Sequence, residues 1–158
     1  GSQRLRDAIN KGVTEQDLFS TVEAAFKAGW QTIKLYFMIG LPTETDEDVL
    51  AIVDLVKGVA GIGREALGKR SPRMKLNVTV SSFIPKPATP MQWDGQISRE
   101  EIARRQHLIK DGIRDRQVRV SFHDSRQSVV EAALARGSRQ TGSAILNAFR
   151  AGAILDAW

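Results

Sequence analysis

The sequence contains no cysteine among its 158 residues. Without a thiol, these residues can form no disulfide, zinc–thiolate site, cysteine nucleophile or cysteine-held iron–sulfur cluster. Histidine is also scarce, with only His107 and His123 present. We therefore expect no metal ligand in this chain, because the two residue types that most often bind transition metals are absent or nearly so.

Long apolar runs are missing as well. No segment has the uninterrupted apolar length that a membrane-spanning helix needs. Residues 1–6 carry two arginines and lack the apolar centre of a signal peptide. The apolar fraction of 42% and the charged fraction of 26% exclude collagen-like and largely disordered chains. The composition predicts a globular protein in the cytoplasm, without a membrane partner.

The net charge of +5 is modest and is spread along the sequence. Its densest part is the segment 99–119, which holds seven basic residues diluted by four acidic ones. Such a mixed run is typical of a solvated helix face. The alternative is a groove for a phosphate-bearing substrate or a nucleic acid, which would make the chain a non-enzymatic binding module.

The apolar positions switch repeatedly between a helical and a strand-like period. This pattern predicts three strands, at residues 32–39, 75–84 and 118–122. It predicts helices over residues 14–28, from residue 45 onward, and over 98–113, 126–136 and 138–151, with a loop rich in glycine and charge at 61–73. Alternating helices and strands indicate an α/β fold with parallel strands, and three strands are too few for a closed barrel of about eight.

Helix starts and stops support these boundaries. Thr14 and Thr45 are suitable N-caps, because a side-chain oxygen there accepts an otherwise unpaired amide of the first turn. Ser98 and Glu101 have the spacing of a complete capping box. Gly29 follows the first long helix and predicts its end.

The first candidate site follows the strand at 32–39. In parallel α/β folds, ligands bind at the carboxyl ends of the strands. Gly40 would let a ligand approach the backbone, or would simply allow a tight strand-to-helix turn. Glu44 would contact a ligand, or would be an acid at the start of the next helix.

The second candidate site follows the strand at 75–84. Pro85, Pro87 and Pro90 stiffen the loop, so that it keeps its shape at low entropic cost. Lys86 would then bind an anion, and Trp93 would stack on a ring. The alternative is a rigid connection with Trp93 in the core.

Two further patterns carry weaker signals. His123 and Asp124 form an acid–histidine pair, but a satisfied core or capping histidine beside an N-cap aspartate is the more common arrangement. Residues 63–69 have the glycine and lysine spacing of a phosphate-binding P-loop. Arg70 then stands where that motif needs a hydroxyl, and the segment precedes a strand instead of following one.

Several stretches together resemble the radical S-adenosylmethionine (radical SAM) superfamily, and most closely its proteins with a B12-binding domain. They are residues 1–6, 34–45, 83–93, 135–139 and 152–158. The resemblance implies a partial (β/α)6, TIM-like barrel. In that family a CxxxCxxC loop after the first strand holds a [4Fe-4S] cluster, which reduces SAM to a 5′-deoxyadenosyl radical.

By this pattern, the chain corresponds to the second half of such a barrel (1–124) with a C-terminal helical extension (125–158). The cluster loop and the N-terminal half would lie upstream, so that the chain alone would hold neither cofactor and would contain no catalytic residue. Its expected partners are that missing half or a second copy at an exposed strand edge, unless the C-terminal helices cover the edge. The expected SAM-binding residues are Ser2, Arg4, Met38, Ile39, Gly40, Glu44, Phe83, Ile84 and Pro85.

Overall fold

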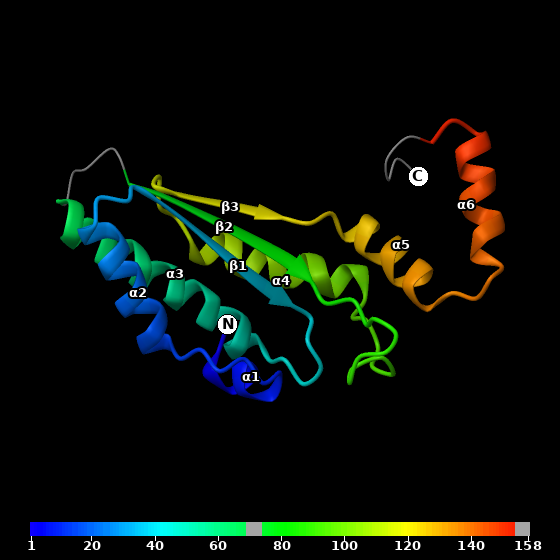
Figure 1. The fold of residues 1–158 in the computed structure, drawn as a ribbon, viewed down its shortest axis with the longest axis horizontal. Helices are drawn as coiled ribbons and strands as arrows, with labels where there is room; N and C mark the ends of the chain where they lie inside the picture. Colours follow the sequence, from blue (N-terminus) through cyan, green and yellow to red (C-terminus); the bar gives the residue numbers. More distant parts are fainter. Residues whose placement is uncertain (69–73, 154–158) are drawn as a thin grey trace.

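The computed structural model describes residues 1–68 and 74–153 (Figure 1). Helices and strands alternate along the chain as the apolar periodicity predicts. The elements are α1 (Gln3–Ala8), α2 (Glu15–Lys27), β1 (Thr32–Ile39), α3 (Asp46–Leu67), β2 (Lys75–Ser82), α4 (Arg99–Gly112), β3 (Val118–Phe122), α5 (Ser125–Arg136) and α6 (Thr141–Arg150).

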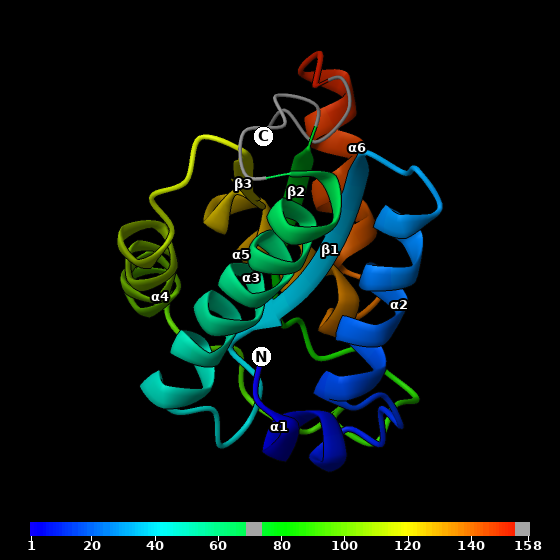
Figure 2. The same ribbon diagram turned by 90° about the vertical axis from the view of Figure 1, so that its left-hand side faces the viewer.

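The three strands form one parallel sheet in the order β1-β2-β3. Thr32 pairs with Lys75 and Ile39 with Ser82, and the pairing of β2 with β3 runs from Leu76–Val118 onward. The helices α2, α3 and α4 lie on one side of this sheet (Figures 1 and 2). The predicted α/β fold with parallel strands is therefore confirmed.

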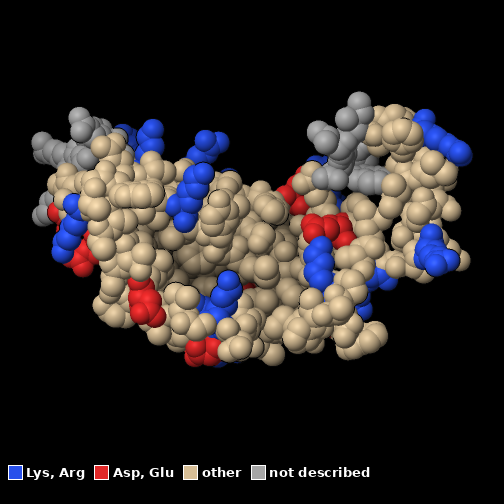
Figure 3. Space-filling view, in the orientation of Figure 1, with Lys and Arg blue, Asp and Glu red and all other residues tan. Residues whose placement is uncertain are grey.

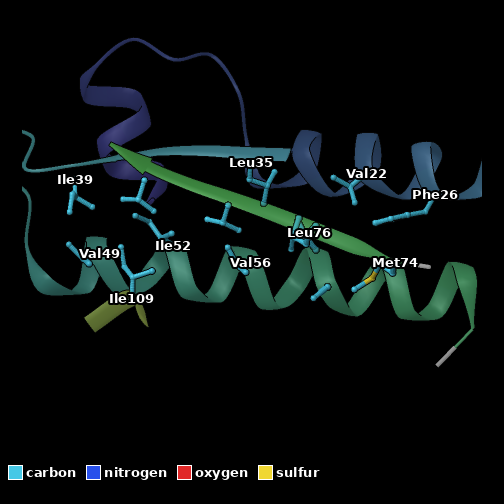
Figure 4. Close-up of a cluster of buried hydrophobic side chains, with 14 residues drawn as sticks. Val22, Phe26, Leu35, Ile39, Val49, Ile52, Val56, Met74, Leu76 and Ile109 are labelled. Carbon is cyan, nitrogen blue, oxygen red and sulfur yellow. The ribbon is translucent and has the colours of Figure 1, made fainter. Parts of the chain in front are cut away.

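The main hydrophobic core lies between the sheet and these helices (Figure 4). Alternate residues of β2 are buried, because successive strand side chains point to opposite faces. Helix α3 supplies the largest share and packs against α2 and α4. The fully buried side chains of this core include Phe26, Ile39, Val49, Ile52, Val56, Val59, Leu76, Val78, Val80 and Ile109.

The predicted loop at 61–73 begins too early, because α3 continues to Leu67. Gly63, one of the glycines that suggested a loop, serves helix packing instead, as does Gly58 earlier in α3. A Cβ on Gly58 would lie 2.6 Å from the Phe19 ring, and one on Gly63 would lie 3.0 Å from the Phe26 ring. Residues 69–73 of the predicted loop lie outside the described residues.

Other boundaries differ from the predictions in smaller ways. Helix α1 was not predicted; Ser2 caps it by accepting the Leu5 N–H. Strand β2 ends at Ser82, two residues before the predicted end, because β1 also ends at the paired residue Ile39. The short α1, the turn after β1 and the chain after β2 then meet at one place.

The predicted helix caps are present, with one correction. The Thr14 and Thr45 side chains both cap their helices, and each does so within a complete capping box. Ser98 accepts the Glu101 N–H at 3.2 Å, but the expected complete box is wrong. The Glu101 carboxylate binds Arg104 and Arg105 instead of reaching back to the Ser98 backbone. Gly29 ends α2 with a φ of 92°.

The C-terminal helices do not cover the edges of the sheet. Figure 1 shows α5 and α6 beyond the carboxyl ends of the strands. Coverage of a strand edge by these helices, one of the two expected arrangements, is therefore wrong. Within residues 1–68 and 74–153, β2 alone pairs with β1, so the other edge of β1 has no strand partner there. In the same ranges, no helix has the length and apolar character required to cross a membrane.

Two glycines on α3 test this packing. Gly61→Ala is expected to raise the free energy of unfolding by about 0.5–1 kcal/mol, because alanine favours the helix. A methyl group at that position meets no atom within 4 Å. Gly63→Ala is expected to lower the free energy by about 1–3 kcal/mol, because the methyl group meets the buried Phe26 and Met74 side chains. Urea denaturation followed by circular dichroism measures both, and equal shifts would contradict this packing.

Candidate functional site

Three of the stretches that carry the family resemblance, residues 1–6, 34–45 and 83–93, meet at the carboxyl ends of β1 and β2, a place that we call the carboxyl edge. Leu5 of α1, Leu41 after β1 and Phe83 after β2 form a second buried apolar cluster. Met91, from the proline-stiffened loop, packs against it. Parallel α/β sheets bind ligands at this edge, and this contact gathers the candidate residues there.

The turn after β1 depends on Gly40. This residue has a φ of 86°, and a Cβ there would lie 3.0 Å from the Ile97 side chain. The turn therefore needs glycine for its own geometry. Thr43 in the same turn has a φ of 63°, which is strained for a β-branched residue. Such strain persists only where surrounding contacts impose it.

Glu44 supplies one of those contacts. Its carboxylate Oε2 accepts the Gly40 N–H at 2.6 Å and also binds the Arg105 guanidinium of α4. The Glu44 side chain is fully buried, and that of Arg105 is 10% exposed. Arg105 also donates to the Glu44 carbonyl at 3.3 Å and to Glu101 at 2.8 Å. The pair thus fastens the turn to α4, which lies 61 residues further along the chain.

Burial dominates the electrostatics of Glu44. It raises the pKa of the Glu44 carboxyl above its ordinary value, although the Gly40 N–H and the Arg105 guanidinium act in the opposite direction. Glu101 differs, because bonds from Arg104 and Arg105 lower its pKa to about 2. Oε2 of Glu44 is occupied by protein groups and holds the turn, whereas the buried Oε1 has no hydrogen-bond partner among the described residues.

Asp48 joins the N-terminal segment to α3. Its carboxylate binds the Ser2 hydroxyl and the Arg4 guanidinium, and accepts the Thr45 N–H at 2.9 Å. Arg4 also donates to the Thr43 carbonyl at 2.9 Å. Burial alone would raise the pKa of Asp48, but the bonds from Arg4, Ser2 and Thr45 hold it well below its ordinary value. Two of the expected SAM-binding residues, Ser2 and Arg4, therefore position this edge.

The other residues expected to bind SAM differ in how exposed their side chains are. Met38 is 41% exposed, and Ile84 is partly exposed. Ile39 is fully buried in the main core, and Phe83 and Pro85 are buried at the carboxyl edge. Of these residues, Met38 and Ile84 are therefore the ones that expose apolar surface. Ile39, Phe83 and Pro85 are buried beneath that surface.

The proline-stiffened loop presents its aromatic residue to solvent. Trp93 is 84% exposed, so its alternative placement in the core is wrong. Lys86, expected to serve an anion, forms an ion pair with Glu131 of α5. Gln96 donates to the carbonyls of Phe83 and Ser128, which ties the end of this loop to both segments.

The His123–Asp124 pair and the pattern at residues 63–69 can now be compared with the structure. Asp124 is the N-cap of α5 and accepts the Arg126 N–H at 2.7 Å, as expected. His123 is exposed, so a core histidine is the wrong interpretation. Gly63 lies inside α3 and does not form a phosphate-binding loop; Lys69 and Arg70 of that pattern lie outside the described residues. In the ranges 1–68 and 74–153, no three His, Asp or Glu side chains gather closely enough to hold a metal ion.

Sequence reasoning missed the two groups that organise the edge. Asp48 was not singled out, although its position three residues after Thr45 suits a capping box. Arg105 was one residue of a basic run, and no local signal connects it to Glu44. Both contacts join segments that are more than 40 residues apart.

A cavity of about 430 Å³ lies beside β1, between that strand and the segment that leads from α1 into α2. Its lining is mainly apolar and adjoins the edge of β1 that has no strand partner in the described ranges. The apolar lining includes Leu5, Ile9, Val13, Leu18, Phe37 and Met38.

Comparison with known proteins gives one relative. The chain is 32% identical over 139 residues to an uncharacterized protein, MJ0966, of Methanocaldococcus jannaschii. The match covers 87% of this chain but only 28% of the relative, so the chain spans little more than a quarter of that protein's length. No family model and no solved structure matches the chain.

Adjacent arginines on α4 test the buried pair. Arg105→Met is expected to lower the free energy of unfolding by about 3 kcal/mol or more, because Glu44 remains buried without its cation. Arg104→Met is the matched control and should cost much less, because Arg104 pairs with Asp46 and Glu101 at the surface. Urea denaturation at pH 7 measures both variants, and similar losses would contradict a special role for Arg105.

The lowered pKa of Asp48 predicts an acid-dependent contribution to stability. An acid whose folded pKa lies below the unfolded value of about 3.9 stabilises the fold above that pH, and the contribution fades as the pH falls further. Asp48→Asn should lower the free energy of unfolding at pH 7 by about 1–3 kcal/mol. The free energy of unfolding of this variant should also fall less steeply between pH 5 and pH 3 than that of the unsubstituted chain. Asp54→Asn, at an exposed position of α3, is the control. An unchanged acid slope in Asp48→Asn would refute the assignment.

Proposed function

We propose that this chain is the second half of a radical SAM-type partial barrel and forms one wall of the pocket for SAM and substrate. The observation that carries the proposal is the meeting of Leu5, Leu41 and Phe83 at the carboxyl edge. These residues belong to three of the stretches that carry the resemblance, residues 1–6, 34–45 and 83–93. They are far apart in the sequence, and a shared ligand pocket explains why they gather where parallel sheets bind ligands.

The arrangement of the sheet supports the same proposal. Parallel strands with helices on one side have the form of a barrel wall, in which the opposite face lines the interior. The edge of β1 that has no strand partner among the described residues, and the apolar cavity beside it, would receive the missing N-terminal half of the barrel. The greater length of the relative leaves ample chain for such a half. A cytoplasmic location and self-association through the same edge stay predictions.

The residues at the carboxyl edge fit part of a SAM site. Met38 and Ile84 offer apolar surface to an adenine ring beside the Gly40 turn, and Glu44 and Asp48 keep that turn in place. With a reduced [4Fe-4S] cluster, SAM supplies the chemistry that removes a hydrogen atom from a substrate. This chain has no cysteine to hold a cluster, so that part of the site would belong to the upstream half.

The alternative function, nucleic-acid binding through residues 99–119, has less support. Arg104 and Arg105 of this segment are already engaged by Asp46, Glu44 and Glu101. Phosphate binding would compete with these ion pairs. Strong salt-dependent binding of RNA or DNA through this segment would favour the alternative.

The whole protein that contains this sequence provides the test. We expect its reading frame to encode CxxxCxxC upstream of Gly1, and the protein purified without oxygen to bind a [4Fe-4S] cluster and cleave SAM. Met38→Asp should weaken SAM binding about tenfold or more, because it places a charge at the adenine wall. Trp30→Asp, an exposed position before β1, should leave SAM binding unchanged. Absence of the upstream motif, or equal SAM binding by Met38→Asp, would contradict the proposal.

A further inference from the structure

The sheet has a second face that points away from α2, α3 and α4, and we call it the open face. Side chains alternate along each strand, and the exposed positions of the burial patterns lie on this face. Thr79 and Ser121 confirm the placement, since their hydroxyls lie 3.2 Å apart across β2 and β3. The positions on this face are Thr32, Lys34, Tyr36, Met38, Lys75, Asn77, Thr79, Ser81, Arg119 and Ser121.

The strand register arranges these side chains in rows. Lys34, Asn77 and Arg119 lie side by side across the three strands. The next row toward the carboxyl edge holds Tyr36, Thr79 and Ser121. Neighbouring strands lie about 4.8 Å apart and successive rows about 7 Å apart. Lys34 and Arg119 therefore stand about 10 Å apart at the backbone, on either side of Asn77.

The open face carries positive charge without compensation. None of its ten positions is acidic, and Lys34, Lys75 and Arg119 are all exposed. In the part of the chain that the structure describes, these three cations form no ion pair or hydrogen bond, whereas Arg4, Arg64 and Arg105 each bind an acid. Figure 3 shows Lys and Arg side chains along the upper left rim, with a hollow between that part and the C-terminal helices.

We propose that the open face binds a small organic phosphate. The phosphate lies over Asn77 between Lys34 and Arg119, where two flexible cations and an amide converge on one anion. The organic part lies one row further, against the ring of Tyr36, which is 73% exposed. The separation of the two rows matches a phosphate monoester whose ring lies about 7 Å from the phosphorus, as in a nucleoside monophosphate.

This inference concerns a different position from the SAM wall, on the sheet face that the proposed function assigns to the barrel interior. The phosphate position lies toward the amino-terminal half of the strands, and the SAM wall lies at the carboxyl edge. The residues involved, Lys34, Asn77 and Arg119, take no part in the contacts of Glu44 or Asp48. Loss of one function would therefore leave the other testable.

Titration of the 158-residue chain with AMP, followed by backbone amide NMR, tests the proposal. AMP should shift amides of β1, β2 and β3, and Lys34→Gln/Arg119→Gln should weaken its binding about tenfold or more. The control Lys57→Gln/Lys110→Gln removes the same charge from exposed positions on α3 and α4, and should leave the affinity within about twofold. Equal affinity of the two double variants, or no binding of AMP, would overturn the proposal.

Further probes separate the two parts of the ligand. Adenosine should bind about tenfold more weakly than AMP, because it lacks the phosphate. Tyr36→Ser should weaken AMP binding but leave ribose 5-phosphate binding unchanged, and failure of either result would overturn the corresponding contact. Much tighter, salt-dependent binding of a single-stranded oligonucleotide through Lys34 and Arg119 would overturn the small ligand in favour of a nucleic acid. Circular dichroism confirms that each variant folds.

Discussion

The buried ion pair between Glu44 and Arg105 is the contact on which the carboxyl edge depends. Burial of two charges is costly unless good geometry and further hydrogen bonds offset the loss of water. Here the Gly40 N–H and the Glu101 carboxylate provide those bonds. The pair fixes the turn after β1 relative to α4, and Asp48 then fixes α1 to the start of α3. The edge is thus held by ionic contacts together with the Leu5, Leu41 and Phe83 cluster, whereas the core between the sheet and its helices is apolar.

The two faces of the sheet have different chemistry, and this difference organises the whole domain. The helix face is closed by apolar side chains such as Ile52, Val56 and Val78. The open face presents cations, hydroxyls and a tyrosine, none of which forms an apolar core. A strand that is buried on one face and polar on the other suits a wall beside a ligand space. The proposed SAM wall and the proposed phosphate position occupy different ends of that wall.

Local sequence patterns predicted most of the fold, because apolar periodicity and helix caps act over a few residues. The strands β1 and β3 and the caps Thr14 and Thr45 follow from such signals. The length of α3 could not be predicted in this way. Gly63 permits close packing against Phe26 of another helix, and no local pattern reveals that contact. The Glu44–Arg105 pair was missed for the same reason, as its partners come from distant segments. The order of the strands predicted that candidate residues such as Gly40 and Phe83 lie at the carboxyl edge, but their contacts required the fold.

Hydrogen exchange at the Gly40 amide tests the central role of the ion pair most directly. This amide donates to the buried Glu44 carboxylate, which is itself held by Arg105. If the pair holds the turn, the opening that exposes the Gly40 amide costs a large part of the free energy of global unfolding. This amide then exchanges as slowly as amides in the core of β1. Exchange as fast as in an exposed turn would contradict the account, because the turn would then open without disturbing α4.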